Sequence, residues 1–302
     1  MNSDFRQTGS VVALGSFDGL HIGHMAVINA AKNIAAHTGA TPLICTFLEH
    51  PMKVLRGAAP PALFTGAVKD EAFRNTGVEV YKLDFALVKD MEPEAFFEDI
   101  LVKTLHVKGV CCGFNYTFGS HGAGTPELLQ KYCEEEGIVF SDSDPTTLDG
   151  DTVSSTRIRK ALEEGNVELA ARMLGRPFKF RQEVVNGDHR GRTWGIPTIN
   201  QPYPEELVTP RYGVYMSRCT VDGRNYYGAT NIGVRPTVGE GQAVSSETNL
   251  LDYEGDLYGK FVDISLLRFL RPEKKFDNFT SLELQIKSDI STIRKFSELD
   301  AR

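Results

Sequence analysis

The sequence predicts an α/β fold followed by an all-β fold, and two observations support this division. Apolar, strand-like runs alternate with helical patterns up to about residue 175, which is typical of a parallel sheet with helices on both faces. From about Phe178 the helical patterns stop and short apolar runs alternate with turn residues, which is typical of a small antiparallel barrel. We therefore expect two domains, residues 1–177 and residues 178–302, the second ending in a helix.

The strands and helices of the first domain follow from apolar periodicity and from residues that begin or end helices. The expected strands are residues 11–17, 41–47, 78–83, 107–114 and one that begins at 138–140. The expected helices are residues 22–36, 93–105, 125–137, 154–164 and 166–175. Pro93 suits a first helical turn, while Gly137 and Gly165 are natural helix ends. Ligands of such sheets bind beyond the carboxyl ends of the strands.

The second domain is expected to consist of short antiparallel strands. Alternating apolar residues predict the strands 182–185, 213–220, 224–232 and 261–267. Asp222-Gly223, between two of these runs, is a typical two-residue hairpin turn. Thr280 and Glu283 form a capping-box pattern, so a last helix is expected from Thr280 to about Lys295.

Composition places the chain among ordinary globular proteins and argues against several classes. The chain has 302 residues, which is long enough for two domains. It is 41% hydrophobic and 24% charged, which is normal for a globular protein. The net charge of −7 argues against nonspecific nucleic-acid binding. The five cysteines show no Cys-x-x-Cys spacing, which indicates reduced thiols in a cytoplasmic protein. The first ten residues lack the apolar core of a signal peptide, and no apolar run is long enough to span a bilayer.

Features suited to phosphate binding come together in residues 15–24, Gly-Ser-Phe-Asp-Gly-Leu-His-Ile-Gly-His, at the end of the first expected strand. A glycine-rich turn lets the backbone approach a ligand, and a helix start offers free N–H groups and a positive dipole end. His21 and His24 lie on one helical face, so both can reach one anion. Each feature alone would suit an ordinary turn with capping histidines, but together they predict a nucleotide site.

Two later segments of the first domain carry weaker signals. Arg157 and Arg159 fall in the first turn of a helix that Ser154 or Ser155 caps, where cations oppose the helix dipole unless a polyphosphate binds. An ordinary solvated helix face is the alternative. Residues 113–119, Gly-Phe-Asn-Tyr-Thr-Phe-Gly, follow a buried strand and could cradle a flat ring, or could form an aromatic loop with a purely structural role.

The second domain contains a comparable set of polar residues at 187–200, Gly-Asp-His-Arg-Gly-Arg-Thr-Trp-Gly-Ile-Pro-Thr-Ile-Asn. Glycine N–H groups and arginines suit phosphates. Thr198 and Asn200 are two apart on an expected strand, so they point to the same side and offer hard oxygen ligands for Mg²⁺. Glu247 could be a general base toward a hydroxyl, although a single glutamate is more often a surface carboxylate.

With these motifs in this order, the chain resembles the family of bacterial bifunctional riboflavin kinases/FMN adenylyltransferases, also called FAD synthetases. Residues 15–24, with the His-x-Gly-His of the HIGH-motif nucleotidyltransferases, are similar to this family's first adenylyltransferase signature, and residues 113–119 and 154–159 to two later ones. The segments 166–177, 197–200, 233–237 and 247–259 are similar to the family's link and to motifs of its kinase module. The family usually has glycine at the position of Gln182 and a small residue at that of Ile199, and both departures bear on kinase rate or ATP affinity.

The resemblance implies a Rossmann-like nucleotidyltransferase domain and a β-barrel kinase domain that act in turn. The kinase would transfer the γ-phosphoryl group of ATP to riboflavin, and the first domain would then adenylylate FMN with a second ATP, giving FAD and pyrophosphate. The implied catalytic residues are His21, His24, Arg157 and Glu247. The implied ATP contacts of the first domain are Gly15, Phe17, Asp18, Gly23, Ser154, Ser155, Thr156 and Arg159. In the remaining roles, Asn115 would face the flavin, Gly187, Gly191 and Arg192 would bind the ATP of the kinase, and Thr198 and Asn200 would hold Mg²⁺.

Three other functions share part of this pattern. An adenylyltransferase for another phosphorylated substrate would lack the C-terminal barrel with Pro-Thr-x-Asn. An aminoacyl-tRNA synthetase would carry a Lys-Met-Ser-Lys-Ser segment, which this sequence lacks. A flavin-binding regulatory or carrier protein would have no need to retain the catalytic residues. The expected partners are therefore riboflavin, FMN and ATP, with no nucleic acid and no membrane, while formation of a homo-oligomer is left open.

Overall fold

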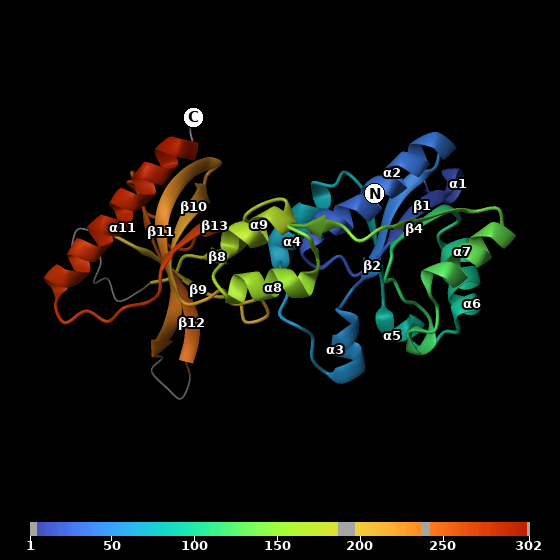
Figure 1. Ribbon diagram of the computed structural model, residues 1–302, viewed down its shortest axis with the longest axis horizontal. Helices are drawn as coiled ribbons and strands as arrows, with labels where there is room; N and C mark the ends of the chain where they lie inside the picture. The colour runs from blue at the N-terminus through green and yellow to red at the C-terminus, as the bar shows by residue number, and fades with distance from the viewer. Residues whose placement is uncertain (1–4, 187–196, 237–241, 301–302) are drawn as a thin grey trace. The chain divides into compact units, whose positions relative to one another are not determined.

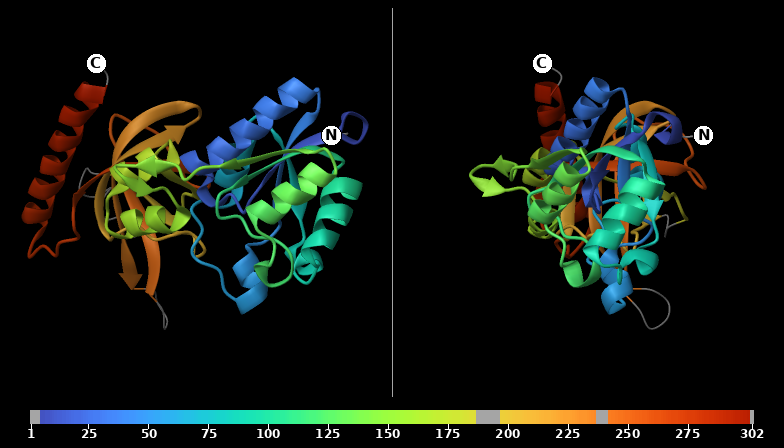
Figure 2. Two further views of the ribbon diagram at one scale, coloured as in Figure 1. Left: turned by 45° about the vertical axis from the view of Figure 1, so that its right-hand side comes forward. Right: turned by 90° about the vertical axis from the view of Figure 1, so that its right-hand side faces the viewer.

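The computed structural model describes residues 5–186, 197–236 and 242–300, and the chain divides into two compact units. The first unit holds the residues up to Pro60 together with Lys69–Ser155. The second unit holds Pro61–Val68 and the residues from Thr156 onward. The elements of both units are labelled in Figure 1 and drawn from two further directions in Figure 2.

The first unit is built on a five-stranded parallel sheet with the strand order β3-β2-β1-β4-β5. Its strands are β1 (Ser10–Leu14), β2 (Thr41–Phe47), β3 (Glu79–Leu83), β4 (Val107–Gly113) and β5 (Val139–Ser143). This confirms the predicted parallel sheet. The chain proceeds from β1 toward β2 and β3 on one side, and later adds β4 and β5 on the other. The switch point of the sheet therefore lies between β1 and β4, where ligands of such sheets bind.

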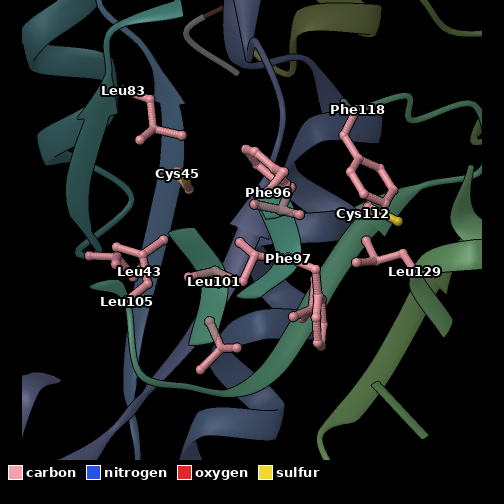
Figure 3. Close-up of a cluster of buried hydrophobic side chains, with 14 of the residues drawn as sticks. Leu43, Cys45, Leu83, Phe96, Phe97, Leu101, Leu105, Cys112, Phe118 and Leu129 are labelled. Carbon is pink, nitrogen blue, oxygen red and sulfur yellow. The ribbon is translucent and has the colours of Figure 1, made fainter. Parts of the chain in front are cut away.

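Helices cover both faces of this sheet, as the alternation of elements predicted. Helix α2 (Ile22–Thr38) packs on one face, so closely that a Cβ added to Gly109 would crowd the side chains of Val11 and Ile34. The opposite face carries the main core of the unit, which joins strand residues to residues of the helical segments 93–104 and 126–135 (Figure 3). Fully or nearly fully buried members of this core are Val12, Leu14, Leu43, Val110, Phe96, Phe97, Leu101, Leu105 and Leu129.

The other helices of this unit differ in places from the prediction. The expected helix 93–105 is α6 (Pro93–Ala95) continued by a π-helical segment η2 (Phe96–Thr104). Further short elements are α1 (Phe5–Thr8), η1 (Asp18–Leu20), α3 (Pro51–Arg56), α4 (Gly66–Arg74), α5 (Phe85–Val88), η3 (Ser120–Gly122), α7 (Pro126–Glu135), β6 (Thr147–Leu148) and β7 (Asp151–Thr152). Most of them were not expected, because a few turns between Gly and Pro residues show too little periodicity to be recognised.

Two helices precede the strands of the second unit. They are α8 (Ser155–Glu163), which begins at the boundary, and α9 (Val167–Leu174). Asn166 caps α9 by accepting a hydrogen bond from the Leu169 N–H (3.1 Å), and Gly175 ends the helix in the left-handed conformation. Both ends agree with the prediction. Helix α9 packs against β8 and β13, so it is part of the same unit as the barrel.

The barrel is a six-stranded antiparallel sheet with the order β8-β13-β10-β11-β12-β9. Its strands are β8 (Phe178–Glu183), β9 (Ile199–Pro202), β10 (Gly213–Val221), β11 (Arg224–Pro236), β12 (Gln242–Leu250) and β13 (Phe261–Arg271). The two edge strands meet, because the Val185 N–H donates to the Asn200 carbonyl (2.8 Å) and Gln201 Nε2 donates to the Gln182 carbonyl (2.7 Å). The predicted hairpin turn is confirmed, with positive φ at Asp222 and Gly223.

The last helix, α11 (Phe279–Asp300), is longer than expected and begins differently. Asn278, rather than Thr280, acts as the cap, since its Oδ1 accepts a hydrogen bond from the Ser281 N–H (2.9 Å). Asparagine is a better cap than threonine, so the predicted capping box at Thr280 was wrong. Asp289 in the middle of the helix is buried and pairs with Arg271 at the end of β13, with 2.9 Å between Nη2 and Oδ2.

Candidate functional site

The turn after β1 has an unusual backbone. Phe17, Gly19 and Leu20 all have positive φ. Phe17 and Leu20 are buried and, unlike glycine, carry a Cβ atom that disfavours this conformation. Holding such residues in this region costs about 1–3 kcal/mol each, and such strain is concentrated at functional sites. The turn is held on the sheet by Thr46, whose Oγ1 donates to the Ser16 carbonyl (3.1 Å). The predicted nucleotide-binding segment is therefore a constrained loop at the carboxyl end of the central strand.

The two histidines of this segment lie together at the start of α2. His21 caps the helix, because its Nδ1 accepts a hydrogen bond from the His24 N–H (3.2 Å). The two rings are stacked with their centroids 3.6 Å apart, and the ring of Phe17 meets His24 edge-on at 5.3 Å. Burial lowers the pKa of His24 well below its usual value, and the neighbouring His21 lowers it further. His24 is therefore neutral at pH 7 in the free protein.

One nitrogen of this pair stands out among the described residues. His24 Nδ1 is buried and makes no hydrogen bond within the described residues. A buried polar atom without a partner is costly, so such an atom at a helix start beside a strained turn is a candidate ligand contact. Because Gly23 has no side chain, the space beside the pair stays open. A Cβ at this position would lie 3.2 Å from His21 Cε1 and 3.6 Å from Thr146 Oγ1.

Ser155 of the predicted segment 154–159 contacts the turn in residues 15–24. Ser155 Oγ donates to the carbonyl of Asp18 (3.0 Å), across 137 positions of sequence. The approach is prepared by Val153, whose N–H donates to the carbonyl of Thr146 (2.8 Å), a residue close to Gly23. The structure thus brings Ser155 to the turn that holds Phe17 and Asp18. Ser154, next to it, is half-buried.

The remaining residues of that segment belong to the second unit. Thr156 is exposed, and Arg157 and Arg159 are half-buried in the first turns of α8. Arg159 Nε donates to the carbonyl of Pro61 (2.6 Å), so part of this guanidinium is used to hold the segment around Pro61. The roles predicted for Thr156, Arg157 and Arg159 toward ATP stay predictions.

The aromatic segment after β4 has two parts with different environments. Phe118 is buried in the core, and Tyr116 stacks on it with ring centroids 6.0 Å apart. Burial raises the pKa of the Tyr116 hydroxyl well above its usual value, so it stays protonated. Phe114 and Asn115 are exposed instead. Because β4 is the neighbour of β1 in a parallel sheet, Asn115 lies at the same edge as residues 15–24 and remains the residue from which flavin contact is predicted.

Sequence reasoning missed a lysine at this edge. Lys69 in α4 is half-buried, and its pKa is lowered by burial and by Lys82, while the carboxylate of Asp18 acts in the opposite direction. Lys82 on β3 pairs in register with Thr46, the residue that holds Ser16. Two lysines therefore stand near the predicted phosphate-binding turn. Lys69 was missed because α4 was not recognised from the sequence, and the place of Lys82 opposite Thr46 depends on strand register.

The candidate kinase residues form a row across three strands of the barrel. Glu247 on β12 pairs directly with Asn200 on β9 and with Asn231 on β11. Directly paired residues of a sheet point to the same face, so the three side chains lie together. Asn200 is buried and Glu247 half-buried. Sequence reasoning missed Asn231, since its place opposite Glu247 depends on strand register.

The residues around this row complete a polar surface. Thr198 precedes β9 by one residue and is half-buried, and the Asn249 Nδ2 donates to the adjacent Pro197 carbonyl (2.8 Å). Within the described residues, no three His, Cys, Asp or Glu side chains form a cluster that could hold a metal ion. Mg²⁺ usually needs only one or two protein ligands when phosphate oxygens supply others, so Thr198 and Asn200 fit such an ion.

Some residues predicted to belong to the kinase site are not among the residues that the structure describes. Gly187, Gly191 and Arg192 fall in residues 187–196, which are outside the described residues. Of the two departures from the family pattern, Gln182 accepts the edge-closing bond through its carbonyl, and Ile199 lies opposite Thr248 in the β9–β12 pairing.

All five cysteines are buried and unpaired, as expected for reduced thiols. No helix of the described chain combines the length and apolar character needed to cross a bilayer.

Comparison with known proteins agrees with both halves of this description. A family model described as FAD synthetase matches residues 4–157, and one described as riboflavin kinase matches residues 174–297. Bifunctional riboflavin kinase/FMN adenylyltransferases from Listeria monocytogenes and Bacillus subtilis are 36% and 37% identical, each over 97% of this chain and 94% of the relative. The protein of the same description from Escherichia coli K12 is 33% identical over 96% of this chain and 93% of its own length.

A solved structure also matches nearly the whole chain. It is a crystal structure described as a macrolide-efflux protein from Streptococcus pneumoniae, with a TM-score of 0.87 and 32% identity over 94% of this chain and 93% of that one. The likeness confirms the order of a parallel α/β sheet followed by an antiparallel barrel.

Proposed function

Since the chain belongs to the family of bifunctional riboflavin kinases/FMN adenylyltransferases and carries both activities, we propose that they are divided between residues 1–177, which adenylylate FMN, and residues 178–302, which phosphorylate riboflavin. The extents of the two family models support this order of the activities, because the FAD synthetase model ends at residue 157 and the riboflavin kinase model begins at residue 174. The buried, unpaired cysteines agree with a cytoplasmic location for both reactions.

In the kinase reaction, Glu247 acts as the general base. The terminal hydroxyl of the ribityl chain attacks the γ-phosphorus of ATP, the bond to the bridging oxygen breaks, and ADP leaves while the hydroxyl proton passes to Glu247. Thr198 and Asn200 would hold Mg²⁺, which would neutralise charge on the phosphates when bound. The row of Asn200, Glu247 and Asn231 is the observation that carries this assignment, since it gathers a carboxylate and amides on one face.

In the adenylyl transfer, the residues of the site orient the phosphates and stabilise their negative charge. No proton has to be removed from the nucleophile. The phosphate of FMN is already anionic, attacks the α-phosphorus of a second ATP and displaces pyrophosphate. The N–H groups at the start of α2 and the His21–His24 pair face the developing charge on the ATP phosphates. Because His24 is neutral in the free protein, it acts there as a hydrogen-bond donor unless the bound polyanion raises its pKa.

The contacts around this pair support the assignment of the adenylyltransferase site. The Ser155–Asp18 hydrogen bond supports a place for Ser154 and Ser155 beside Gly15, Phe17, Asp18 and Gly23. Arg157, Arg159 and Thr156 contribute further phosphate contacts, and Asn115 contacts the flavin. For the kinase, Gly187, Gly191 and Arg192 contact the nucleotide phosphates.

Two variants test the division of labour in the full chain. Glu247→Gln is expected to reduce FMN formation from riboflavin by about 10²–10⁴-fold, while FAD formation from supplied FMN continues. The double variant His21→Ala/His24→Ala is expected to do the reverse and reduce FAD formation by about 10²-fold or more. Both reactions are followed by chromatographic separation of the flavins.

Matched controls make these outcomes specific. Glu254→Gln replaces an exposed glutamate of the barrel unit, and His37→Ala replaces an exposed histidine at the far end of α2. Both controls should retain both activities. A histidine double variant that made FAD at the wild-type rate would exclude the assignment of the first site, and loss of both activities in either test variant would indicate misfolding instead.

A further inference from the structure

A second carboxylate stands beside the row of Glu247. Glu273 follows β13 by two residues, and its Oε1 accepts a hydrogen bond from Asn231 Nδ2 (3.1 Å). Its carboxylate also covers Gly233, so closely that a Cβ added there would collide with it. Since Asn231 is paired with Glu247 across the β11–β12 ladder, Glu273 lies on the same polar surface as the proposed base.

The fold determines where this carboxylate lies. Arg271, two residues earlier, is fastened to α11 by hydrogen bonds from Nε and Nη2 to the buried Asp289 (3.0 and 2.9 Å to Oδ2). The Arg271 carbonyl lies against Gly213 at the start of β10, where a side chain would not fit. The segment is thus fixed at both sides, and Glu273 is presented to Asn231 although its side chain is exposed.

The charge of this pair indicates which substrate it can contact. A carboxylate repels the phosphates of ATP, so Glu273 is poorly suited to bind that part of the nucleotide. Its remaining acceptor positions suit a ligand with several hydroxyl donors, and charge-assisted hydrogen bonds of this kind are the stronger ones. Of the two substrates of the kinase, riboflavin carries a chain of hydroxyl groups, and the last of these is the nucleophile.

We propose that Glu273 and Asn231 bind the hydroxyl-bearing chain of riboflavin and thereby present its terminal hydroxyl to Glu247. The proposal rests on the proposed function of Glu247, which it deepens by assigning the binding of the acceptor chain to a separate pair of residues. Asn231 supplies an amide beside the base, and Glu273 supplies an acceptor one row farther along the same face.

The test compares two flavins that share the ring but differ in the chain. Glu273→Gln keeps the size of the side chain and removes its charge. In the full-length protein we expect the dissociation constant and KM of riboflavin to rise about tenfold, as for the loss of a charge-assisted hydrogen bond. Binding of lumiflavin, which has no hydroxyl chain, should be unchanged when measured by quenching of flavin fluorescence.

Three further measurements decide the interpretation. Asn231→Ala should show the same selective loss, and the double variant should lose less than the product of the two single effects. Glu298→Gln, which alters an exposed glutamate of α11, should bind both flavins normally. FAD formation from supplied FMN should be unchanged in every variant, and unchanged binding of lumiflavin shows that the altered barrel is folded.

Several results would overturn the proposal. Unchanged riboflavin affinity in Glu273→Gln would do so, as would equal weakening of both flavins, which would indicate a purely structural role. Restoration of activity by excess Mg²⁺ alone would show that Glu273 is a metal ligand. Failure of Glu247 as the base is distinguishable, because Glu247→Gln would then keep its kcat while the selective loss of riboflavin binding in Glu273→Gln persisted.

Discussion

The ring of His21 stacks on the ring of His24, with centroids 3.6 Å apart and planes inclined by 15°. Two charged imidazoles in this arrangement would repel each other, and burial of His24 adds to that cost. His24 is therefore neutral in the free protein, and the proposed contact of the pair with phosphate does not depend on a charge on this ring.

The first prediction concerns the pH dependence of adenylyl transfer. Because burial and His21 lower the pKa of His24, this histidine stays neutral from about pH 8 down to about pH 6.5 and becomes protonated only in more acidic solution. The ratio of kcat/KM for ATP between wild type and His24→Asn should then be constant over that interval. A ratio that rises as the pH falls from 8 to 6.5 would show instead that the charged form is used. Taking the ratio cancels the ionisation of the substrates.

The second prediction concerns the hydrogen bond between Ser155 and Asp18. Ser155→Ala removes the donor to the Asp18 carbonyl, which is a partner 137 residues away and part of the constrained turn. We expect FAD formation from FMN to fall about tenfold, since a lost hydrogen bond that positions a site costs on the order of 1 kcal/mol or more. Riboflavin phosphorylation should be unaffected. Ser297→Ala in the last helix is the matched control, and an equally active Ser155→Ala would show that the contact has no role in catalysis.

The third prediction concerns a buried carboxylate of the barrel. Asp263 on β13 is 5% exposed and pairs with Arg181 and with Lys179 (3.1 Å) on β8. Burial alone would raise its pKa, but the two cations outweigh burial and lower it. Asp263→Asn should reduce the free energy of unfolding by about 1–3 kcal/mol at pH 7, less than for a fully buried pair because both cations are partly exposed.

The same pair predicts the sign of a pH effect. A carboxylate with a lowered pKa in the folded state contributes stability above its unfolded pKa of about 3.9, and this contribution is lost as the pH falls through the lower folded value. The difference between wild type and Asp263→Asn in urea unfolding should therefore shrink below about pH 4. Asp222→Asn, at an exposed hairpin turn, should change stability by no more than about 0.5 kcal/mol.

The fourth prediction concerns the core of the α/β unit. Leu101 in η2 is fully buried in the cluster drawn in Figure 3. Leu101→Ala should lower the free energy of unfolding by about 2–5 kcal/mol, because it removes buried methyl groups and leaves a cavity. Leu87→Ala is the matched control, since Leu87 is 77% exposed, and its effect should stay within about 0.5 kcal/mol. Similar effects of the two variants in thermal unfolding would contradict this description of the core.

Local sequence patterns predicted many of the strands, helices and turns of this protein. Strand and helix periodicity predicted the parallel sheet, and Asp222-Gly223 predicted the hairpin, because such features depend on neighbouring residues alone. The same is true of the caps of α9 and of the segment 15–24. Where two local signals competed, the prediction was wrong, as at α11, where Asn278 takes the capping position expected for Thr280.

The tertiary structure decided which distant residues meet. Ser155 reaches Asp18 only because the chain from β5 returns past the start of α2, and Asn231 stands opposite Glu247 only in one register of β11 and β12. A shift of this strand pairing by one residue would separate Asn231 from Glu247, and nothing in the local sequence states the register. Glu273 owes its place to the buried pair of Arg271 and Asp289. Such relationships depend on packing across the whole unit, so the sequence named many of the candidate site residues and the fold determined their neighbours.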